Sequence, residues 1–318
     1  MNYLSNTQNE ITAIEINKNL FSRWIDFIDV KPKTVETYTR NIKPFMNYLK
    51  DNEISNPERQ DIIDYRTMLQ QEHKEATTVQ AYLMAVKQFF KWAEIEGLYP
   101  DIAKNVKSPK LRREHKKQPL TIKQVQTLLN SIDRDNEIGK RDYAVLSLML
   151  TTGLRTIEIT RALVKDLETF TSTETEEDYR ALIIRGKGRD DRTEFVKLST
   201  PVSEAIDDYL TSRPDLTDNS PLFASAANRN SGQALTTRSI SRIVKNRLKD
   251  IGIDRDNITA HSLRHTAGSL NLRNGGTLEE TQQLLRHENI NTTMIYIKQI
   301  ERENNQSENR LSGLFFEE

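Results

Sequence analysis

Apolar residues recur every three or four positions between residues 17 and 105, and this spacing constrains the fold more than any other feature. It is the signature of amphipathic helices that bury one face. Breakers such as Pro32 and Pro57 divide the pattern into four stretches, and Gly97 ends the last of them. The pattern therefore predicts an all-α domain of four helices at residues 17–103, preceded by a flexible polar arm at residues 1–16.

The helical pattern disappears between Pro100 and Pro119, where basic residues dominate. The segment from Lys104 to Lys117 holds seven basic residues and one acid, Glu114. This composition predicts a linker at residues 104–119. A solvated charge run fits it, and so does a strap laid along a phosphate backbone if DNA is the partner. The candidate DNA-binding residues are Lys107, Lys110, Arg112, Arg113, Lys116 and Lys117.

The pattern becomes helical again at Thr121, a suitable helix cap, and a further helix is expected to end at Gly153. Residues 181–184 and 193–198 are β-like and are joined through Gly186-Lys187-Gly188. This arrangement predicts an antiparallel hairpin with a glycine-containing loop.

The remaining segments complete the fold prediction. The acidic stretch 168–178 is long for a turn between strands and is expected to be a surface excursion. The chain is expected to be mainly α, with the N-terminal four-helix domain followed by an α+β domain at residues 120–300 that holds a small antiparallel sheet. Residues 301–318 are expected to form a tail.

Composition limits the class of protein. No stretch approaches the roughly 18 apolar residues of a membrane span, and no basic region followed by an apolar one suggests a secretory signal. A cytoplasmic location is therefore expected. The absence of cysteine excludes disulfides and cysteine chemistry. The 46 basic and 46 acidic residues balance, which argues mildly against nucleic-acid binding, but the charges are unevenly distributed.

Several polar residues have the spacing of a site for an anion. His261 and Arg264 are three positions apart and hence neighbours on one helix face, where a proton-exchanging ring and a rigid fork of donors suit an anionic oxygen. Arg155 is expected in the first turn of a helix, where free backbone N–H groups favour anions. Glu158 is placed to orient Arg155 or to cap that helix, and Lys187 is expected at the exposed hairpin tip.

His287 and Tyr296 are nine residues apart, about two and a half helical turns, which on one helix would put them on opposite faces. The polar segment 288–291 predicts a break that lets both face one site, with Asn291 or Thr292 as the next cap. Each candidate alone has an ordinary explanation as a surface pair, a core tyrosine or a simple turn.

The combination is more specific. The chain reads Thr-Gly-Leu-Arg-x-x-Glu at 152–158, Gly-Lys-Gly at 186–188, His-x-Leu-Arg-His at 261–265 and Leu-Leu-Arg-His at 284–287 before Tyr296. This set resembles the tyrosine recombinase (phage integrase) family over about residues 17–300, and its simple two-domain Xer-like members in particular, because no room for an arm-binding domain precedes residue 17. The family commonly has glycine where this chain has Arg286.

The resemblance implies a catalytic set and a mechanism. Tyr296 would attack a DNA phosphodiester to form a 3′-phosphotyrosine, with no metal, ATP or other cofactor. The two arginines would clamp the non-bridging oxygens, His261 would act as acid or base, His287 would hydrogen-bond the phosphate, and Lys187 would protonate the departing 5′-oxygen. The implied catalytic residues are Arg155, Lys187, His261, Arg264, His287 and Tyr296, supported by Glu158 and His265.

The partners implied are a double-stranded DNA recombination site, held in a clamp of two domains, and further copies of the chain. The tail, with apolar residues 314–316, would exchange between subunits of a tetramer, and accessory proteins could take part. No membrane partner is expected. Integration, excision or resolution of a mobile element or replicon fits the resemblance, as does housekeeping resolution of chromosome dimers. A topoisomerase-like relaxing enzyme, a catalytically silent DNA-binding protein on the same fold and a helical scaffold remain alternatives.

Overall fold

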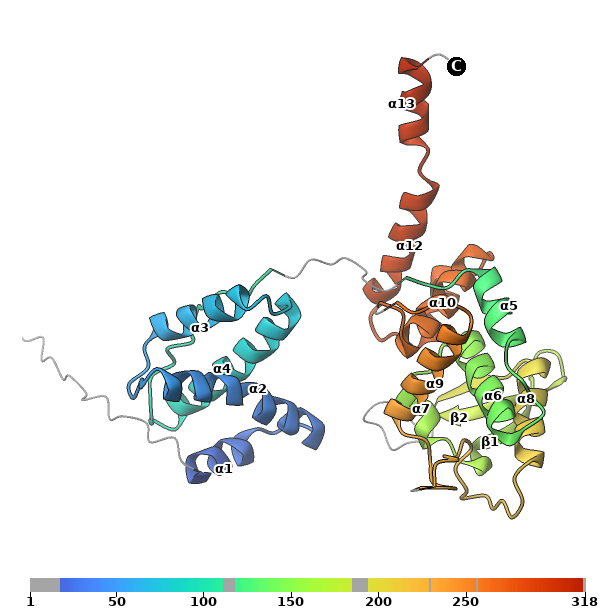
Figure 1. The fold of residues 1–318 in the computed structure, drawn as a ribbon, viewed down its shortest axis with the longest axis horizontal. Helices are drawn as coiled ribbons and strands as arrows, with labels where there is room; N and C mark the ends of the chain where they lie inside the picture. Colours follow the sequence, from blue (N-terminus) through green and yellow to red (C-terminus); the bar gives the residue numbers. More distant parts are fainter. Residues whose placement is uncertain (1–17, 111–117, 185–193, 229, 256, 317–318) are drawn as a thin grey trace, which may run out of the picture. The chain divides into compact units, whose positions relative to one another are not determined.

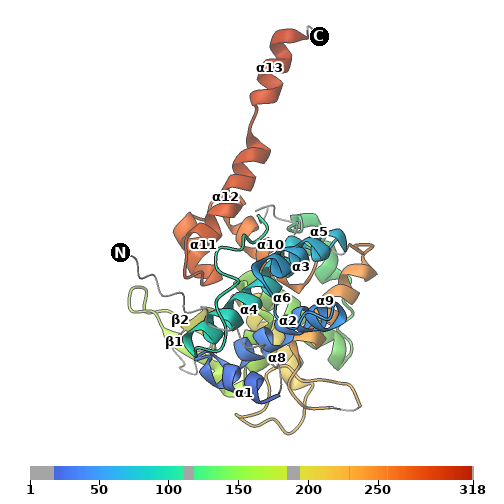
Figure 2. The same ribbon diagram turned by 90° about the vertical axis from the view of Figure 1, so that its left-hand side faces the viewer.

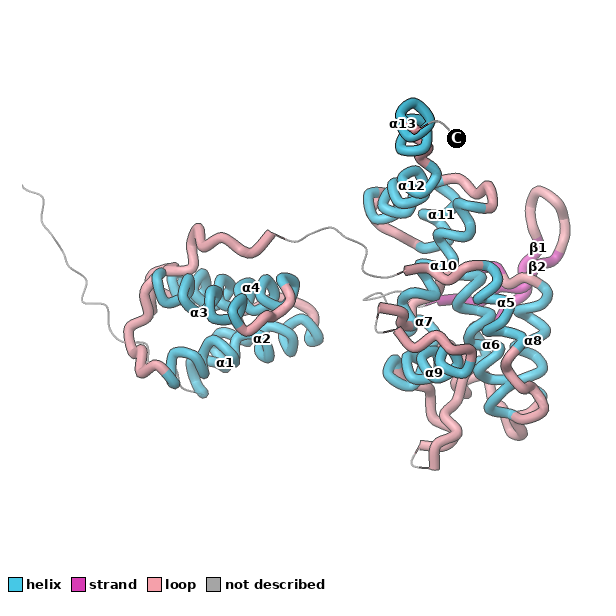
Figure 3. The backbone as a smooth tube through the Cα atoms, turned by 45° about the horizontal axis from the view of Figure 1, so that its top comes forward, coloured by secondary structure: helices cyan, strands magenta, loops and turns pink. Residues whose placement is uncertain are grey.

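The computed structural model describes residues 18–110, 118–184, 194–228, 230–255 and 257–316. The chain divides into two compact units, Met1–Glu114 and His115–Glu318, coloured blue to cyan and green to red in Figure 1. Figure 3 shows that all the strands drawn belong to the second unit. Each unit has its own hydrophobic core and is described by itself.

The N-terminal unit is helical throughout its described elements, which confirms the prediction of four helices. They are α1 (Lys18–Phe27), α2 (Pro32–Asp51), α3 (Arg59–Gln71) and α4 (Ala76–Ile95). Pro32 occupies the first turn of α2, where its missing N–H and fixed φ cost nothing. Helix α4 packs against the other three. Its Phe89 meets Trp24 edge to face, with ring centroids 5.5 Å apart, a favourable aromatic geometry in a closed core.

The chain stays in contact with this unit for several residues after α4. The hydroxyl of Tyr99 donates to the carbonyl of Pro57 at 2.8 Å, and Val106 is buried in the core. Arg66 donates to the carbonyl of Lys107 at 2.8 Å. The part of the basic segment that the structure describes therefore leaves the core only after Lys107.

The second unit is built around α6 (Glu137–Thr152), which packs against α5 (Ile122–Asn130), α8 (Thr200–Thr211) and α10 (Ala260–Arg273). The other helices are α7 (Thr156–Arg161), a short 3-10 turn at Val164–Asp166, α9 (Thr237–Asp250), α11 (Leu278–Leu285), α12 (Asn291–Asn304) and α13 (Ser307–Phe315). Thr121 caps α5 by accepting from the backbone N–H of Gln124 at 3.2 Å, as predicted.

Gly153 ends α6 with φ at +60°, a conformation that favours glycine. A Cβ on this residue would lie 2.6 Å from Cδ2 of Leu285, at the end of α11. The turn between α6 and α7 and the end of α11 are thus in close contact, although more than a hundred residues separate them along the chain.

A three-stranded antiparallel sheet in the order β1-β2-β3 completes the unit. It comprises β1 (Leu167–Thr171), β2 (Asp178–Ile184) and β3 (Glu194–Lys197). Pairing of Ile183 with Phe195 confirms the predicted hairpin, while its loop with Lys187 lies outside the described residues. The prediction of a surface excursion at 168–178 was wrong in part, because residues as far as Thr171 form the edge strand β1. The aromatic ring of Phe170, in β1, stacks on those of Tyr179 and Phe195.

The last two helices extend from the second unit, with α13 beyond α12 (Figures 1 and 2). Four apolar side chains near the end of α13 are exposed: Leu311, Leu314, Phe315 and Phe316. Across the described ranges, no helix combines the length and the apolar character needed to span a bilayer.

Candidate active site

Two turns and two helices of the second unit bring most of the predicted catalytic residues together. The turns are those between α6 and α7 and between α11 and α12, and the helices are α10 and α12. The guanidinium of Arg264, on α10, donates to the carbonyl of Gly153 at 2.5 Å and to the carbonyl of Leu285. One buried arginine therefore ties both turns to the helix that carries it.

Arg155 is the N-cap residue of α7, one position ahead of the first turn in which it was predicted. Its backbone N–H donates to Oε2 of Glu158 at 2.7 Å, and its Nη1 donates to Oε1 at 2.8 Å. Glu158 therefore caps the helix and orients the arginine at once. Burial by itself raises the pKa of Glu158, but the charge of Arg286 and the hydrogen bonds from Arg155 outweigh it and hold that pKa below its usual value.

Arg264 is only 2% exposed. Burial, together with the nearby charges of Arg155 and Arg286, lowers the pKa of its guanidinium to about 9, so it stays protonated at neutral pH. Clustered guanidinium groups repel one another and favour a bound anion among them.

His287 follows the end of α11, and its Nδ1 lies 2.8 Å from the hydroxyl oxygen of Thr293. Burial and the positive charges of Arg264 and Arg155 lower the pKa of its ring to about 4. The imidazole is consequently neutral at pH 7. It can donate or accept one hydrogen bond at Nε2, according to the tautomer that Thr293 selects.

Tyr296 lies on α12 and is 6% exposed. Its hydroxyl lies 2.6 Å from Nδ1 of His265, and the His265 ring meets that of His261 edge-on, with centroids 4.7 Å apart. Burial raises the pKa of Tyr296 to about 12, although Arg264 opposes this shift. The hydroxyl thus contacts His265, which was predicted only to support the site.

The predicted helix break is confirmed, because α11 ends at Leu285 and α12 begins at Asn291. The predicted cap is wrong. Ile290 occupies the N-cap position without a side-chain bond, and the side chain of Asn289 accepts from the backbone N–H of Asn291 at 2.9 Å. A local Asx-type contact therefore replaces the helix cap.

The remaining predicted residues fall outside the described residues or in the other unit. Lys187 and the linker residues Arg112, Arg113, Lys116 and Lys117 lie outside the described residues. Lys107 and Lys110 are exposed and belong to the N-terminal unit.

Arg286 is a site residue whose role the sequence did not settle. It ends α11 with φ at +50°, in the left-handed region that explains a preference for glycine and costs another residue about 1–3 kcal/mol. Its Nη2 donates to Oε2 of Glu158 at 2.9 Å. The signal in the sequence was the departure from the glycine that the family commonly has at this position.

A second group that the sequence reading missed is a basic stripe on α9, formed by Arg238, Arg242, Lys245 and Lys249. The four are exposed and follow the i, i+4, i+7, i+11 spacing of one helix face, the signal that could have revealed them. Helix α9 packs against α7, which Arg155 precedes as the N-cap residue, and against α10, which carries Arg264. The stripe is therefore carried by a helix next to the site.

The arrangement suits a phosphate group. Three guanidinium groups, those of Arg155, Arg264 and Arg286, surround one ion-paired carboxylate, Glu158, with a weaker attraction from Glu194 on Arg286. A buried tyrosine hydroxyl and a neutral histidine complete the set. Among the described residues, no group of acidic or histidine side chains has the geometry to hold a metal ion.

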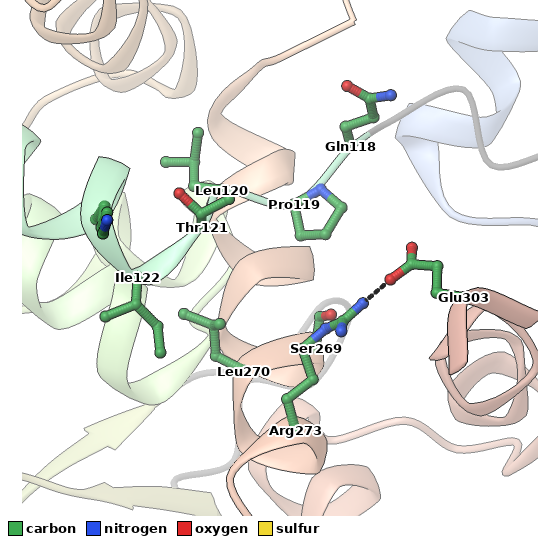
Figure 4. Close-up of a pocket in the computed structure, with 10 residues that line it drawn as sticks. Gln118, Pro119, Leu120, Thr121, Ile122, Ser269, Leu270, Arg273 and Glu303 are labelled. Atoms are coloured by element: carbon green, nitrogen blue, oxygen red, sulfur yellow. Dashed lines mark hydrogen bonds and ion pairs between the residues drawn. The ribbon is translucent and has the colours of Figure 1, made fainter. Parts of the chain in front are cut away.

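The pocket drawn in Figure 4 is separate from these residues. It has a volume of about 600 Å³ and a largely apolar lining that includes Leu120, Ile122 and Leu270. An ion pair between Arg273 of α10 and Glu303 of α12 lies along one side (Figure 4). None of the described candidate catalytic residues lines it, so this pocket is not part of the candidate active site.

Residues 118–303 match the phage integrase family, and residues 19–97 match its N-terminal SAM-like domain. The first match alone covers more than half of the chain. The chain therefore belongs to the phage integrase family, whose members are tyrosine recombinases, which confirms the family resemblance seen in the sequence.

Two relatives illustrate the likeness. Tyrosine recombinase XerD of Listeria monocytogenes is 28% identical over 269 residues, which are 83% of this chain and 86% of the relative. Tyrosine recombinase XerC of Thermodesulfovibrio yellowstonii is 30% identical over 275 residues, 83% and 84% of the two chains.

Solved structures share the fold. The XerH recombinase in a post-cleavage complex with its palindromic difH substrate superposes with a TM-score of 0.68 at 21% identity, over 88% of this chain and 78% of that one. A lambda integrase dimer bound to a COC′ core site gives a TM-score of 0.62 at 17% identity, over 86% and 95% of the two chains.

Proposed function

We propose that the chain is a site-specific recombinase that cleaves and rejoins DNA strands through a 3′-phosphotyrosine on Tyr296. The observation that carries the proposal is the position of this hydroxyl, buried and 2.6 Å from the His265 ring, in a site with three arginines. Membership of the phage integrase family and the Xer recombinases among its relatives support it.

The chemistry follows from the charges. The Tyr296 oxygen attacks the phosphorus as its proton passes to a nearby histidine, and the bond from phosphorus to the 5′-oxygen breaks. His265 is the ring in contact with the hydroxyl, and His261 packs against His265 as the second candidate acid or base. Negative charge grows on the non-bridging oxygens, where Arg155 and Arg264 stabilise it.

The leaving group needs a proton, and Lys187 remains the proposed donor to the 5′-oxygen. Neutral His287 would donate a hydrogen bond to the phosphate. Because the phosphotyrosine link conserves the bond energy, the reverse attack by a 5′-hydroxyl rejoins a strand without ATP. The proposed mechanism uses no metal and no other cofactor.

The proposed substrate is a double-stranded recombination site, since solved neighbours are described as bound to such sites. Residues 17–103 would form a core-binding domain, residues 104–119 a basic linker and residues 120–300 the catalytic domain. The linker residues and the basic stripe of α9 would neutralise phosphates, which makes affinity strongly salt-dependent. A cytoplasmic location and service to a mobile element or replicon, with chromosome-dimer resolution as the alternative, belong to this proposal.

Assembly is proposed to run through the tail at residues 301–318. The exposed apolar residues Leu314, Phe315 and Phe316 lie at the end of α13 and directly after it, and contiguous exposed apolar residues mark contact surfaces. The apolar pocket of Figure 4 is a surface of matching chemistry on a second copy. A cyclic tetramer would pair each tail with the pocket of its neighbour, and accessory proteins could control the order of strand exchange.

The alternatives on this fold lack a supporting observation. A catalytically silent DNA-binding protein would not need a buried tyrosine held on a histidine beside clustered arginines. A relaxing enzyme of the topoisomerase type would act as a monomer, whereas the exposed apolar end of α13 suits a partner chain.

The test is incubation with a nicked suicide duplex that carries the recombination site, because the nick releases a short strand and traps the covalent intermediate. A protein–DNA adduct is expected with the natural chain and none with Tyr296→Phe, while both bind the duplex in a gel-shift assay. An adduct that persists in Tyr296→Phe would refute the assignment of the nucleophile.

A further inference from the structure

Arg286 occupies a position where its backbone conformation is unfavourable. Its φ of +50° at the end of α11 is one that glycine adopts freely and an arginine does not. Its side chain is only 9% exposed, although arginine is strongly polar. An arginine held in this way must be retained by contacts of its side chain.

Those contacts join the two turns of the site. Nη1 of Arg286 donates to the carbonyl of Leu284 at 2.8 Å and to that of Thr152 at 3.3 Å, and Nη2 donates to Oε2 of Glu158 at 2.9 Å. In return, Nη2 of Arg155 donates to the carbonyl of Arg286 at 3.3 Å. Each arginine thus donates a hydrogen bond to the turn that carries the other, and both pair with Glu158 between them. We call this set of contacts the brace.

The charge arrangement gives this brace a consequence. Glu158 is 1% exposed, and without Arg286 it would pair with Arg155 alone. With two guanidinium groups on one carboxylate, the site carries more positive charge than Glu158 neutralises. In addition, Nε of Arg286 is buried and has no hydrogen-bond partner within the described part of the chain.

We infer that Arg286 is a positioning residue for strand cleavage, which shares Glu158 with Arg155 and thereby holds the Arg155 guanidinium toward the scissile phosphate. This inference rests on the proposed function and deepens it. The glycine that the family commonly has here adopts this backbone conformation freely. Arg286 is strained in it, and its side chain supplies both the brace and a third positive charge.

The test compares Arg286→Lys, Arg286→Gln and Arg286→Gly with the natural chain in single-turnover cleavage of the suicide duplex, with duplex affinity measured separately. Misplacing a group that clamps the reacting centre costs roughly 10- to 100-fold in rate. We expect that loss in the glycine and glutamine variants, with the dissociation constant changed less than about threefold. Lysine, which keeps the charge but not the fork, should restore part of the rate.

A double-mutant cycle tests whether Arg286 acts through Glu158. If it does, Glu158→Gln with Arg286→Gln should cleave at about the rate of the slower single variant, because both changes remove the same brace. Losses that multiply would overturn the positioning role, and so would an Arg286→Gly variant that cleaves at the natural rate. Arg134→Gln, an exposed arginine stacked on Tyr143, is the matched control and should cleave normally.

Folding and the proposed function are controlled in the same series. A melting temperature within a few degrees of the natural chain shows that a slow variant is folded, and Arg286→Gly is the variant that also relieves the backbone. If the natural chain itself forms no adduct on its site, the proposed function fails. If it forms one and the Arg286 variants match it, only this inference fails.

Discussion

The hydroxyl oxygen of Tyr296 lies 2.6 Å from Nδ1 of His265, across the contact between α12 and α10. Burial raises the pKa of this tyrosine to about 12, so only about one hydroxyl in 10⁵ would be ionised at pH 7 without assistance. A tyrosine in that state needs a proton acceptor in contact with it. His265 is placed to be that acceptor.

Removal of the acceptor should slow cleavage and change its pH dependence. We expect His265→Ala to cleave about 10²- to 10⁴-fold more slowly at pH 7, since general-base assistance is worth that much. Its rate should then rise about tenfold per pH unit below about 12, because the tyrosine must ionise unaided. Single-turnover cleavage from pH 6 to pH 9 measures both. An unchanged rate and profile would show that His265 does not accept the proton.

His287 should make the fold sensitive to mild acid. Its pKa falls from about 6.5 in the unfolded chain to about 4 in the site, so the unfolded chain binds more protons between these values. The stabilising contribution is therefore complete above about pH 6.5 and is lost as the pH falls toward 4. We expect a loss of about 1–2 kcal/mol after solvent screening is allowed for.

Urea unfolding at pH 7.5 and pH 5 measures this effect. The free energy of unfolding should fall less between the two pH values in His287→Asn than in the natural chain. Equal losses in both proteins would assign the acid sensitivity to other groups.

Gly153 should not tolerate a side chain. Alanine there would combine φ of +60° with a Cβ 2.6 Å from Cδ2 of Leu285. We expect Gly153→Ala to lower the free energy of unfolding by about 2–4 kcal/mol, from backbone strain and crowding together. The matched control is Gly252→Ala, where φ is +79° and no atom lies within 4 Å of the new Cβ. If denaturation gives both variants the same loss, crowding against Leu285 contributes nothing.

The basic stripe of α9 should contribute to DNA affinity through phosphates. The pair of substitutions Arg242→Gln and Lys245→Gln is expected to weaken duplex binding and to reduce the slope of log K against log salt by about 1 per lost contact. Titrations at several salt concentrations measure the slope. The control, Arg134→Gln, removes an exposed positive charge outside the stripe. A slope that stays constant in the double variant would exclude α9 from the DNA interface.

The tail should matter for assembly and not for the first cleavage. With Leu314→Glu and Phe315→Glu, the exposed apolar end of α13 becomes charged, which opposes burial against a second copy. We expect adduct formation on a single site to remain within about threefold of normal, while complexes with two paired sites are lost on native gels. Paired complexes that survive both substitutions would rule out docking through this end of α13.

Local patterns in the sequence determined much of this protein. The four helices of the N-terminal unit, the capped start of α5 at Thr121 and the hairpin of β2 and β3 follow from periodicity and turn residues that act over a few positions. The order of motifs around Arg155, Arg264 and Tyr296 was sufficient to indicate the family. Edge strand β1 was not predicted from the sequence. Its apolar contact with Tyr179 and Phe195 is made across the sheet, and its acidic segment shows no alternation of apolar and polar residues.

Only the tertiary structure decided which side chains of the site contact one another. The contact of Tyr296 with His265 depends on how α12 packs on α10, and the role of Arg286 depends on the approach of a turn more than a hundred residues away. Such contacts are set by packing between distant segments, whose geometry has no counterpart in local spacing. The chemistry could be read along the chain; the pairing of each group with its partner required the fold.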